Sequence, residues 1–86
     1  MKTFKLIISS PEGDLFNGDA VCISVRGVEG DLAIMAGHIP FVTAIKPCEC
    51  KIELEDGEVK TGSAEGGILN VSSENVRLLA GSFKWE

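Results

Sequence analysis

Residues 25–40 place the strongest limit on what this chain can fold into. They read Val-Arg-Gly-Val-Glu-Gly-Asp-Leu-Ala-Ile-Met-Ala-Gly-His-Ile-Pro, so a glycine or proline recurs every few residues. Both residues disfavour the interior of a helix, because glycine loses much backbone entropy on folding and proline lacks an amide donor. The segment is therefore predicted to form two strands tied by turns. We expect its charged turn, centred on Gly30, to be a docking surface.

Apolar and polar residues alternate with a period of two along most of the chain. Side chains of a strand point to opposite faces in turn, so each apolar set is predicted to face a core. Turn residues separate these runs, and the Asp-Gly pair at 56–57 is the strongest hairpin signal. The pattern predicts an all-β fold: a flattened β-sandwich or barrel of roughly eight to ten short strands, in a single domain over residues 1–86. The apolar sets are Phe4, Leu6 and Ile8; Val21, Ile23 and Val25; Cys50, Ile52 and Leu54; and Val76, Leu78 and Ala80, and the turns fall at 10–14, 17–19, 56–57, 66–67 and 73–75.

Size and charge exclude several classes of function. The 86 residues carry 13 acidic and 8 basic side chains, a net charge of −5. This balance argues against a nucleic-acid-binding protein and against attachment to anionic lipid by charge. No run approaches the roughly 18 apolar residues of a membrane-spanning helix. Hydrophobic residues make up 44% of the chain, which leaves two interpretations open: a dense core, or apolar surface that a partner covers.

Groups that carry catalysis are scarce in this sequence. There is one histidine, His38, and no tyrosine, and no phosphate-binding glycine loop is present. We therefore expect no catalytic residue, no bound cofactor and no enzyme activity. Cys22, Cys48, Cys50 and His38 suggest zinc only weakly, because a lone Cys-x-Cys pair lacks the spacing of structural zinc sites. We interpret the cysteines as small core residues and expect no metal site.

Glu29 and Asp31 flank Gly30 and have two interpretations. They form either a solvated turn or a docking tip that meets cations of a partner. An exposed ion pair contributes only about 0.2–1 kcal/mol, so such acids would orient a contact more than hold it. Buried apolar area would have to supply the affinity of a docked complex.

Five motifs, taken in order, resemble the N-terminal β-sandwich domain of the epsilon subunit of rotary ATP synthases. The resemblance covers nearly the whole chain, although each motif alone is weak. The motifs are Pro-Glu-Gly-Asp-Leu-Phe-Asn-Gly at 11–18, the acidic glycine turn at 27–34 followed by Gly-His-Ile-Pro at 37–40, Thr-Ala-Ile-Lys-Pro at 43–47, Gly-Gly-Ile-Leu-Asn-Val at 66–71, and Asn-Val-Arg-Leu-Leu-Ala at 75–80.

The resemblance implies a non-catalytic rotor subunit of the central stalk. Such a subunit docks on the gamma subunit and on the polar loops of the c-ring, and helps to couple ion-driven rotation to ATP synthesis. The resemblance assigns Glu29, Gly30, Asp31 and His38 to the end that faces the c-ring and the foot of gamma. It assigns the gamma contact to one flank without naming residues. Contact with the membrane is implied only through the complex, at the cytoplasmic face of a bacterial cell membrane or its organellar equivalent.

The sequence departs from the family pattern at two places. Cys48 stands where the family usually has glycine, so we expect the turn there to differ. The two C-terminal helices of most members do not follow Glu86, so the resemblance does not extend to ATP sensing or inhibition. The sequence is then either a piece of a longer chain or a naturally short form. We expect Phe83 and Trp85, near its end, to pack on the sandwich or on a neighbour.

Two other functions stay open. A small acidic all-β domain also fits a carrier of the lipoyl or biotinyl type, which needs a modifiable lysine at a hairpin tip. The best hairpin tip, at 56–57, is Asp-Gly, and Lys46 is fixed beside Pro47. A metal or redox protein built on the cysteines and His38 is the other alternative.

Overall fold

Eight β-strands form the fold of the part of this protein that the structure describes. The structure is a computed structural model that describes residues 2–37 and 39–86, and within these residues no helix is long and apolar enough to cross a membrane. The all-β prediction is confirmed, but β5 and β6 have 13 residues each and are not short. The strands are β1 (Phe4–Ser10), β2 (Gly13–Ala20), β3 (Cys22–Gly27), β4 (Gly30–Met35), β5 (Phe41–Glu53), β6 (Val59–Val71), β7 (Asn75–Ala80) and β8 (Phe83–Trp85).

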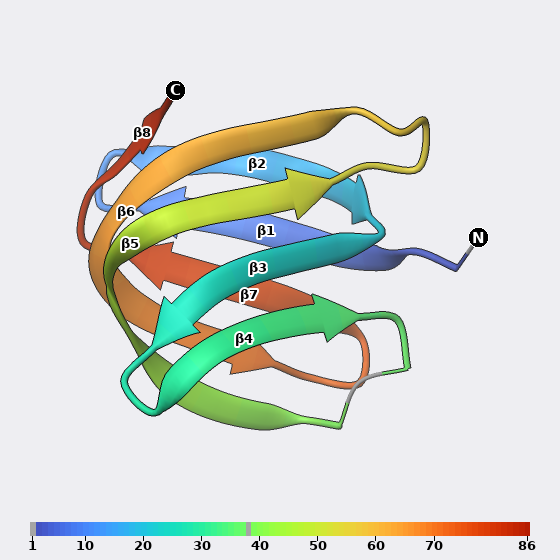
Figure 1. The fold of residues 1–86 in the computed structure, drawn as a ribbon, viewed down its shortest axis with the longest axis horizontal. Coiled ribbons are helices and arrows are strands. Elements are labelled where there is room, and N and C mark those ends of the chain that lie inside the picture. Colours follow the sequence, from blue (N-terminus) through green and yellow to red (C-terminus); the bar gives the residue numbers. More distant parts are fainter. Residues whose placement is uncertain (1, 38) are drawn as a thin grey trace.

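One continuous sheet folds back on itself to make the two layers of the sandwich. Its strand order is β2-β1-β7-β6-β5-β3-β4, and β8 pairs with β6. The long strands β5 and β6 belong to both layers, because they curve from one layer into the other (at the left of Figure 1). We call one half the β1 layer: β2, β1, β7, the end of β6 and the start of β5. The other half is the β3 layer: β4, β3, the end of β5, the start of β6 and β8.

Glycine allows the bend that joins the two layers. Residues 45–47 of β5 face residues 65–67 of β6 at this point. Gly66 and Gly67 have φ angles of +103° and +156°, which side chains with a Cβ rarely adopt. A Cβ on Gly67 would also lie 2.8 Å from the Cα of Ala80 in β7. The prediction that this glycine pair separates two strands is wrong, because it bends a single strand.

The predicted alternation is confirmed in the core between the layers. All twelve residues of the four apolar sets are buried except Val21 and Leu54, which are half-buried. No polar or charged side chain is buried among residues 2–37 and 39–86. The core also includes Ala20, Ile34, Ile45, Leu69 and Val71.

Local turn signals were reliable only where no strand partner competed with them. The hairpin at 56–57 lies as predicted between β5 and β6, with a φ angle of +91° at Gly57. Residues 17–19 lie inside β2 instead of forming a turn, because they pair with β1. Cys48 likewise lies inside β5, opposite Ala64 of β6, so the turn expected there is absent. Cross-strand pairing overrides weak local preference at these two places.

The end of the chain packs on the sandwich, as predicted. Phe83 and Trp85 lie on β8 and are half-buried against the core. Their ring centroids are 4.9 Å apart in an edge-to-face arrangement, and the Trp85 ring lies 6.4 Å from that of Phe16 in β2. The ammonium group of Lys60 lies 5.5 Å from the centroid of the Trp85 ring. These aromatic contacts join β2 of one layer to β8 of the other.

Candidate functional site

The β3–β4 hairpin brings three of the predicted docking residues together. Gly27 pairs with Gly30, so the tip is a tight turn that exposes Glu29, Gly30 and Asp31. Gly30 has a φ angle of +134°, a conformation that favours glycine. The fourth predicted residue, His38, lies outside the described residues. We call Glu29, Gly30 and Asp31 the acidic tip.

Asp31 is already paired within the hairpin. The register sets Arg26 opposite Asp31, and the Nε of Arg26 donates a hydrogen bond to Oδ1 of Asp31 at 2.9 Å. Both side chains remain well exposed, so the pair contributes little to stability. Glu29 forms no ion pair with any described residue, and the tip keeps a net negative charge. Arg26 is not among the docking residues predicted from the sequence, although Arg26 and Asp31 stand symmetrically outside the two glycines of the turn.

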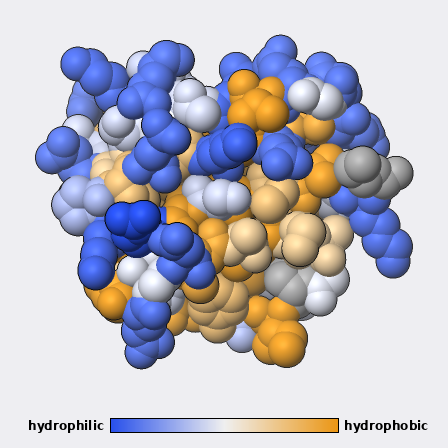
Figure 2. All heavy atoms as spheres, viewed as in Figure 1, coloured by the Kyte–Doolittle hydropathy of each residue, from blue (hydrophilic) through white to orange (hydrophobic). Residues whose placement is uncertain are grey.

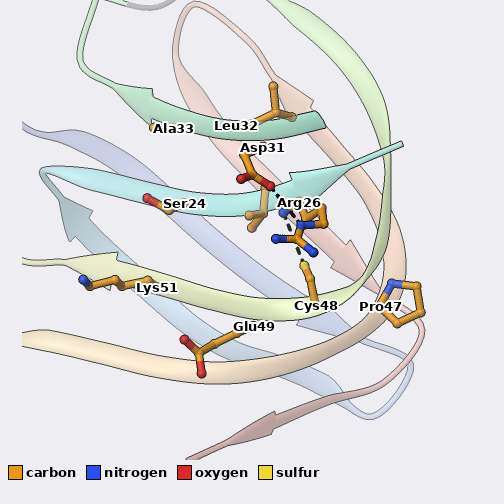
Figure 3. Close-up of a pocket in the computed structure, with 10 residues that line it drawn as sticks. Ser24, Arg26, Asp31, Leu32, Ala33, Pro47, Cys48, Glu49 and Lys51 are labelled. Carbon is orange, nitrogen blue, oxygen red and sulfur yellow. Dashed lines mark hydrogen bonds and ion pairs between the residues drawn. The ribbon is translucent and has the colours of Figure 1, made fainter. Parts of the chain in front are cut away.

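A cavity of about 580 Å³ opens beside this ion pair, where the ladder between β3 and β5 is interrupted (Figure 3). Ser24 pairs with Lys51, but the next paired residues are Gly27 and Ile45. In the gap, the backbone amide of Arg26 donates to Sγ of Cys48 at 3.4 Å. The lining holds two cationic and two acidic side chains, so the cavity favours neither an anionic nor a cationic ligand. These charged residues are Arg26, Lys51, Asp31 and Glu49.

The cysteines behave largely as core residues. Cys50 is fully buried, and burial together with the neighbouring Cys48 raises the pKa of its thiol to about 12. It therefore stays a protonated, weakly nucleophilic thiol at neutral pH. Cys22 and Cys48 are half-buried, and all three thiols are free. Within 2–37 and 39–86, no three side chains of the ligating types are grouped to hold a metal.

Exposed apolar side chains lie on the outer surfaces of both layers. On the β3 layer they include Met35 and Val59, and Figure 2, with β3 and β4 in front, shows hydrophilic side chains at the top and edges and apolar ones in the lower middle. On the outside of the β1 layer they are direct neighbours, since Ile68 of β6 lies between Ala44 of β5 and Leu79 of β7 in the ladder. The exposed fractions are 64% for Val42, 47% for Ile68 and 45% for Leu79. We call Ile7, Val42, Ala44, Ile68 and Leu79 the apolar face.

A groove of about 440 Å³ lies at one side of the apolar face. Ile68 and Leu79 form part of its wall, together with Pro11 from the turn between β1 and β2. Much of the remaining lining is backbone and small side chains, and it includes Gly67 and Gly81. A groove of this composition suits an apolar side chain of a partner more than a polar ligand.

The sequence profile of the ATP synthase delta/epsilon chain β-sandwich domain matches residues 3–86. The chain belongs to this family. The match spans every strand described above, from β1 to β8. The family assignment confirms the resemblance that the five motifs indicate, and it does not favour the carrier alternative.

Solved structures of mitochondrial ATP synthases contain the same fold. A chain from the Euglena gracilis OSCP/F1/c-ring assembly superposes with a TM-score of 0.91 at 20% identity, covering 96% of this chain and 53% of that one. A chain from the Tetrahymena thermophila central stalk/c-ring assembly has a TM-score of 0.78 at 18% identity, covering 95% of this chain and 66% of that one. The chain therefore spans about half the length of the Euglena chain it matches. At these identities the comparison establishes the fold alone.

Proposed function

We propose that residues 1–86 form the β-sandwich domain of a central-stalk subunit in a rotary ATP synthase. In this proposal the domain catalyses no reaction and transmits rotation by binding the gamma subunit and the polar loops of the c-ring. The family match over residues 3–86 is the observation that carries the proposal. The matched chains come from assemblies described as OSCP/F1/c-ring and central stalk/c-ring, which supports partners within such a complex.

We assign the gamma contact to the apolar face. Buried apolar area supplies most of the affinity of a protein interface, and this face offers three large side chains that are about half exposed or more. The neighbouring groove could receive a partner side chain between Ile68 and Leu79. Exposed apolar side chains that lie next to one another are typical of a partner site.

We assign the c-ring contact to the acidic tip. Glu29 carries a negative charge that no described residue pairs, and Arg26 holds Asp31 in a defined position. Charged rim contacts of this kind steer and orient two proteins more than they add affinity. Docking to the ring would hold the domain at the membrane only through the complex, on the cytoplasmic face of a bacterial membrane or the equivalent organellar surface.

Co-purification with the gamma subunit of the same enzyme tests the gamma assignment. Ile68→Asp is expected to weaken binding about tenfold or more, because a carboxylate would be buried against apolar surface. Val59→Asp is the matched control: Val59 is 46% exposed, close to the 47% of Ile68, but lies on the β3 layer. Equal binding of both variants would contradict the assigned face. Failure of the folded wild-type chain to bind gamma at micromolar concentration would contradict the proposed function.

A further inference from the structure

We propose that Arg77 binds a carboxylate of the protein that docks on the apolar face, and so selects its partner. The inference rests on the proposed function, because it assumes that this face becomes an interface. It adds the chemistry that the partner must present there: an apolar surface with one acidic side chain.

Arg77 projects from among the apolar side chains of that face. In the ladder it lies directly opposite Ile7 of β1 and opposite Asn70 of β6. Leu79 is two residues further along β7 and therefore on the same side of the sheet. Arg77 itself is exposed, so its guanidinium group is available to a docking protein.

The charge around Arg77 is unusual for a chain with a net charge of −5. Lys5 and Arg77 are the charged residues at outward positions of β1, of β7, and of the paired segments 41–45 and 67–71. The nearest acidic side chains in the ladder, Asp14 and Asp19, both lie on the edge strand β2, Asp19 opposite Lys5 and Asp14 opposite Ser9, from which it accepts a hydrogen bond. Arg77 forms no ion pair with any described residue.

Docking would remove water from this guanidinium group. A buried charge without a partner opposes binding, whereas a carboxylate can accept two parallel hydrogen bonds from arginine. A partner that presents an acid at this point is therefore favoured over one that presents an apolar or basic residue. Without such an acid on the partner, the aliphatic part of the Arg77 side chain would have to lie along the apolar face, with its guanidinium group in water at the edge of the interface.

Binding of the purified gamma subunit to the full chain distinguishes these two cases. We expect Arg77→Gln to raise the Kd about 30-fold and Arg77→Glu to raise it further. We also expect the wild-type Kd to rise more steeply with salt than that of Arg77→Gln, because the variant has lost the ion pair. Lys5→Gln is the matched control, since Lys5 is a cation of the same layer but lies next to Asp19. Its Kd is expected to change less than threefold (roughly the scale of a rim charge).

The outcomes separate the inference from the proposed function. Weak binding by Ile68→Asp together with wild-type binding by Arg77→Gln and Arg77→Glu would overturn the role of Arg77 and leave the docking face in place. Wild-type binding by all three variants would overturn both the role of Arg77 and the assignment of the docking face. The unfolding midpoint of each variant is measured alongside, and because Arg77 is exposed we expect it to match that of the wild type.

Discussion

Gly67 of β6 is paired with Ala80 of β7 at the point where the sandwich bends. A Cβ on Gly67 would lie 2.8 Å from the Cα of Ala80, and its φ angle of +156° is unfavourable for other residues. The obstacle is backbone and cannot move aside as a flexible side chain would. The connection between the two layers therefore depends on a residue without a side chain at this position.

Replacement of Gly67 by alanine is expected to destabilise the domain by at least about 2 kcal/mol, because β6 and β7 would have to separate. Chemical denaturation measures this change. Gly81→Ala is the control: the nearest atom to its added Cβ is 4.0 Å away, and its stability is expected to stay within about 0.5 kcal/mol of the wild type. Equal stability of the two variants would contradict this account of the bend.

Replacement of Asp31 by a neutral residue tests its role in docking with little effect on the stability of the fold. Asp31→Asn is expected to change the free energy of unfolding by less than about 1 kcal/mol, because both members of its ion pair are exposed. In the reassembled enzyme, we expect it to lower ion pumping relative to ATP hydrolysis. Glu55→Gln, in the hairpin loop between β5 and β6, is the control and should leave coupling unchanged. Unaltered coupling in Asp31→Asn would count against the acidic tip as the ring contact.

The buried thiol of Cys50 makes stability depend on pH in alkaline solution. Its pKa rises from 9.0 to about 12 in the folded chain, because burial and Cys48 disfavour the thiolate. Between these two values the unfolded chain loses this proton and the folded chain keeps it. Stability is therefore expected to fall as pH rises from about 9 to about 12, by up to about 1.4 kcal/mol per pH unit from this group.

Denaturation of the wild type and of Cys50→Val across this pH range measures the contribution of the thiol. The variant removes the ionisable group and keeps an apolar side chain in the core, so its stability should decline less steeply. Parallel decline of the two proteins would show that Cys50 does not contribute.

Gly62 holds the last strand in place by giving room to Phe83. A Cβ on Gly62 would lie 2.6 Å from the Phe83 ring, so Gly62→Ala is expected to displace the ring and loosen β8. Trp85 is the single tryptophan and packs edge-to-face on Phe83, which makes its fluorescence a direct report. We expect a red-shifted emission at native conditions, as the indole gains contact with water. Gly18→Ala, whose added Cβ would meet only ordinary contacts with Phe16, should leave the emission unchanged.

The sequence predicts the acidic tip but not its ion pair or the apolar face. Glycines at 27 and 30 define a tight turn, so the grouping of Glu29 and Asp31 follows from local chemistry. The pairing of Arg26 with Asp31 needs the register of the hairpin. The apolar face needs more, since its residues come from four strands, and β1 pairs with β7 from the other end of the chain.

The sequence by itself determined that this chain is made of strands, which side chains of β1, β3, β7 and the end of β5 enter the core, and where the Asp-Gly hairpin lies. These features follow from the two-residue period and from turn chemistry, both of which act over a few neighbouring residues. Only the tertiary structure decided that β6 continues through Gly66 and Gly67, that Cys48 lies in a strand, and that Ile68 and Leu79 share an exposed surface. Those features depend on how whole strands pair with one another, which preferences acting over a few neighbouring residues do not fix.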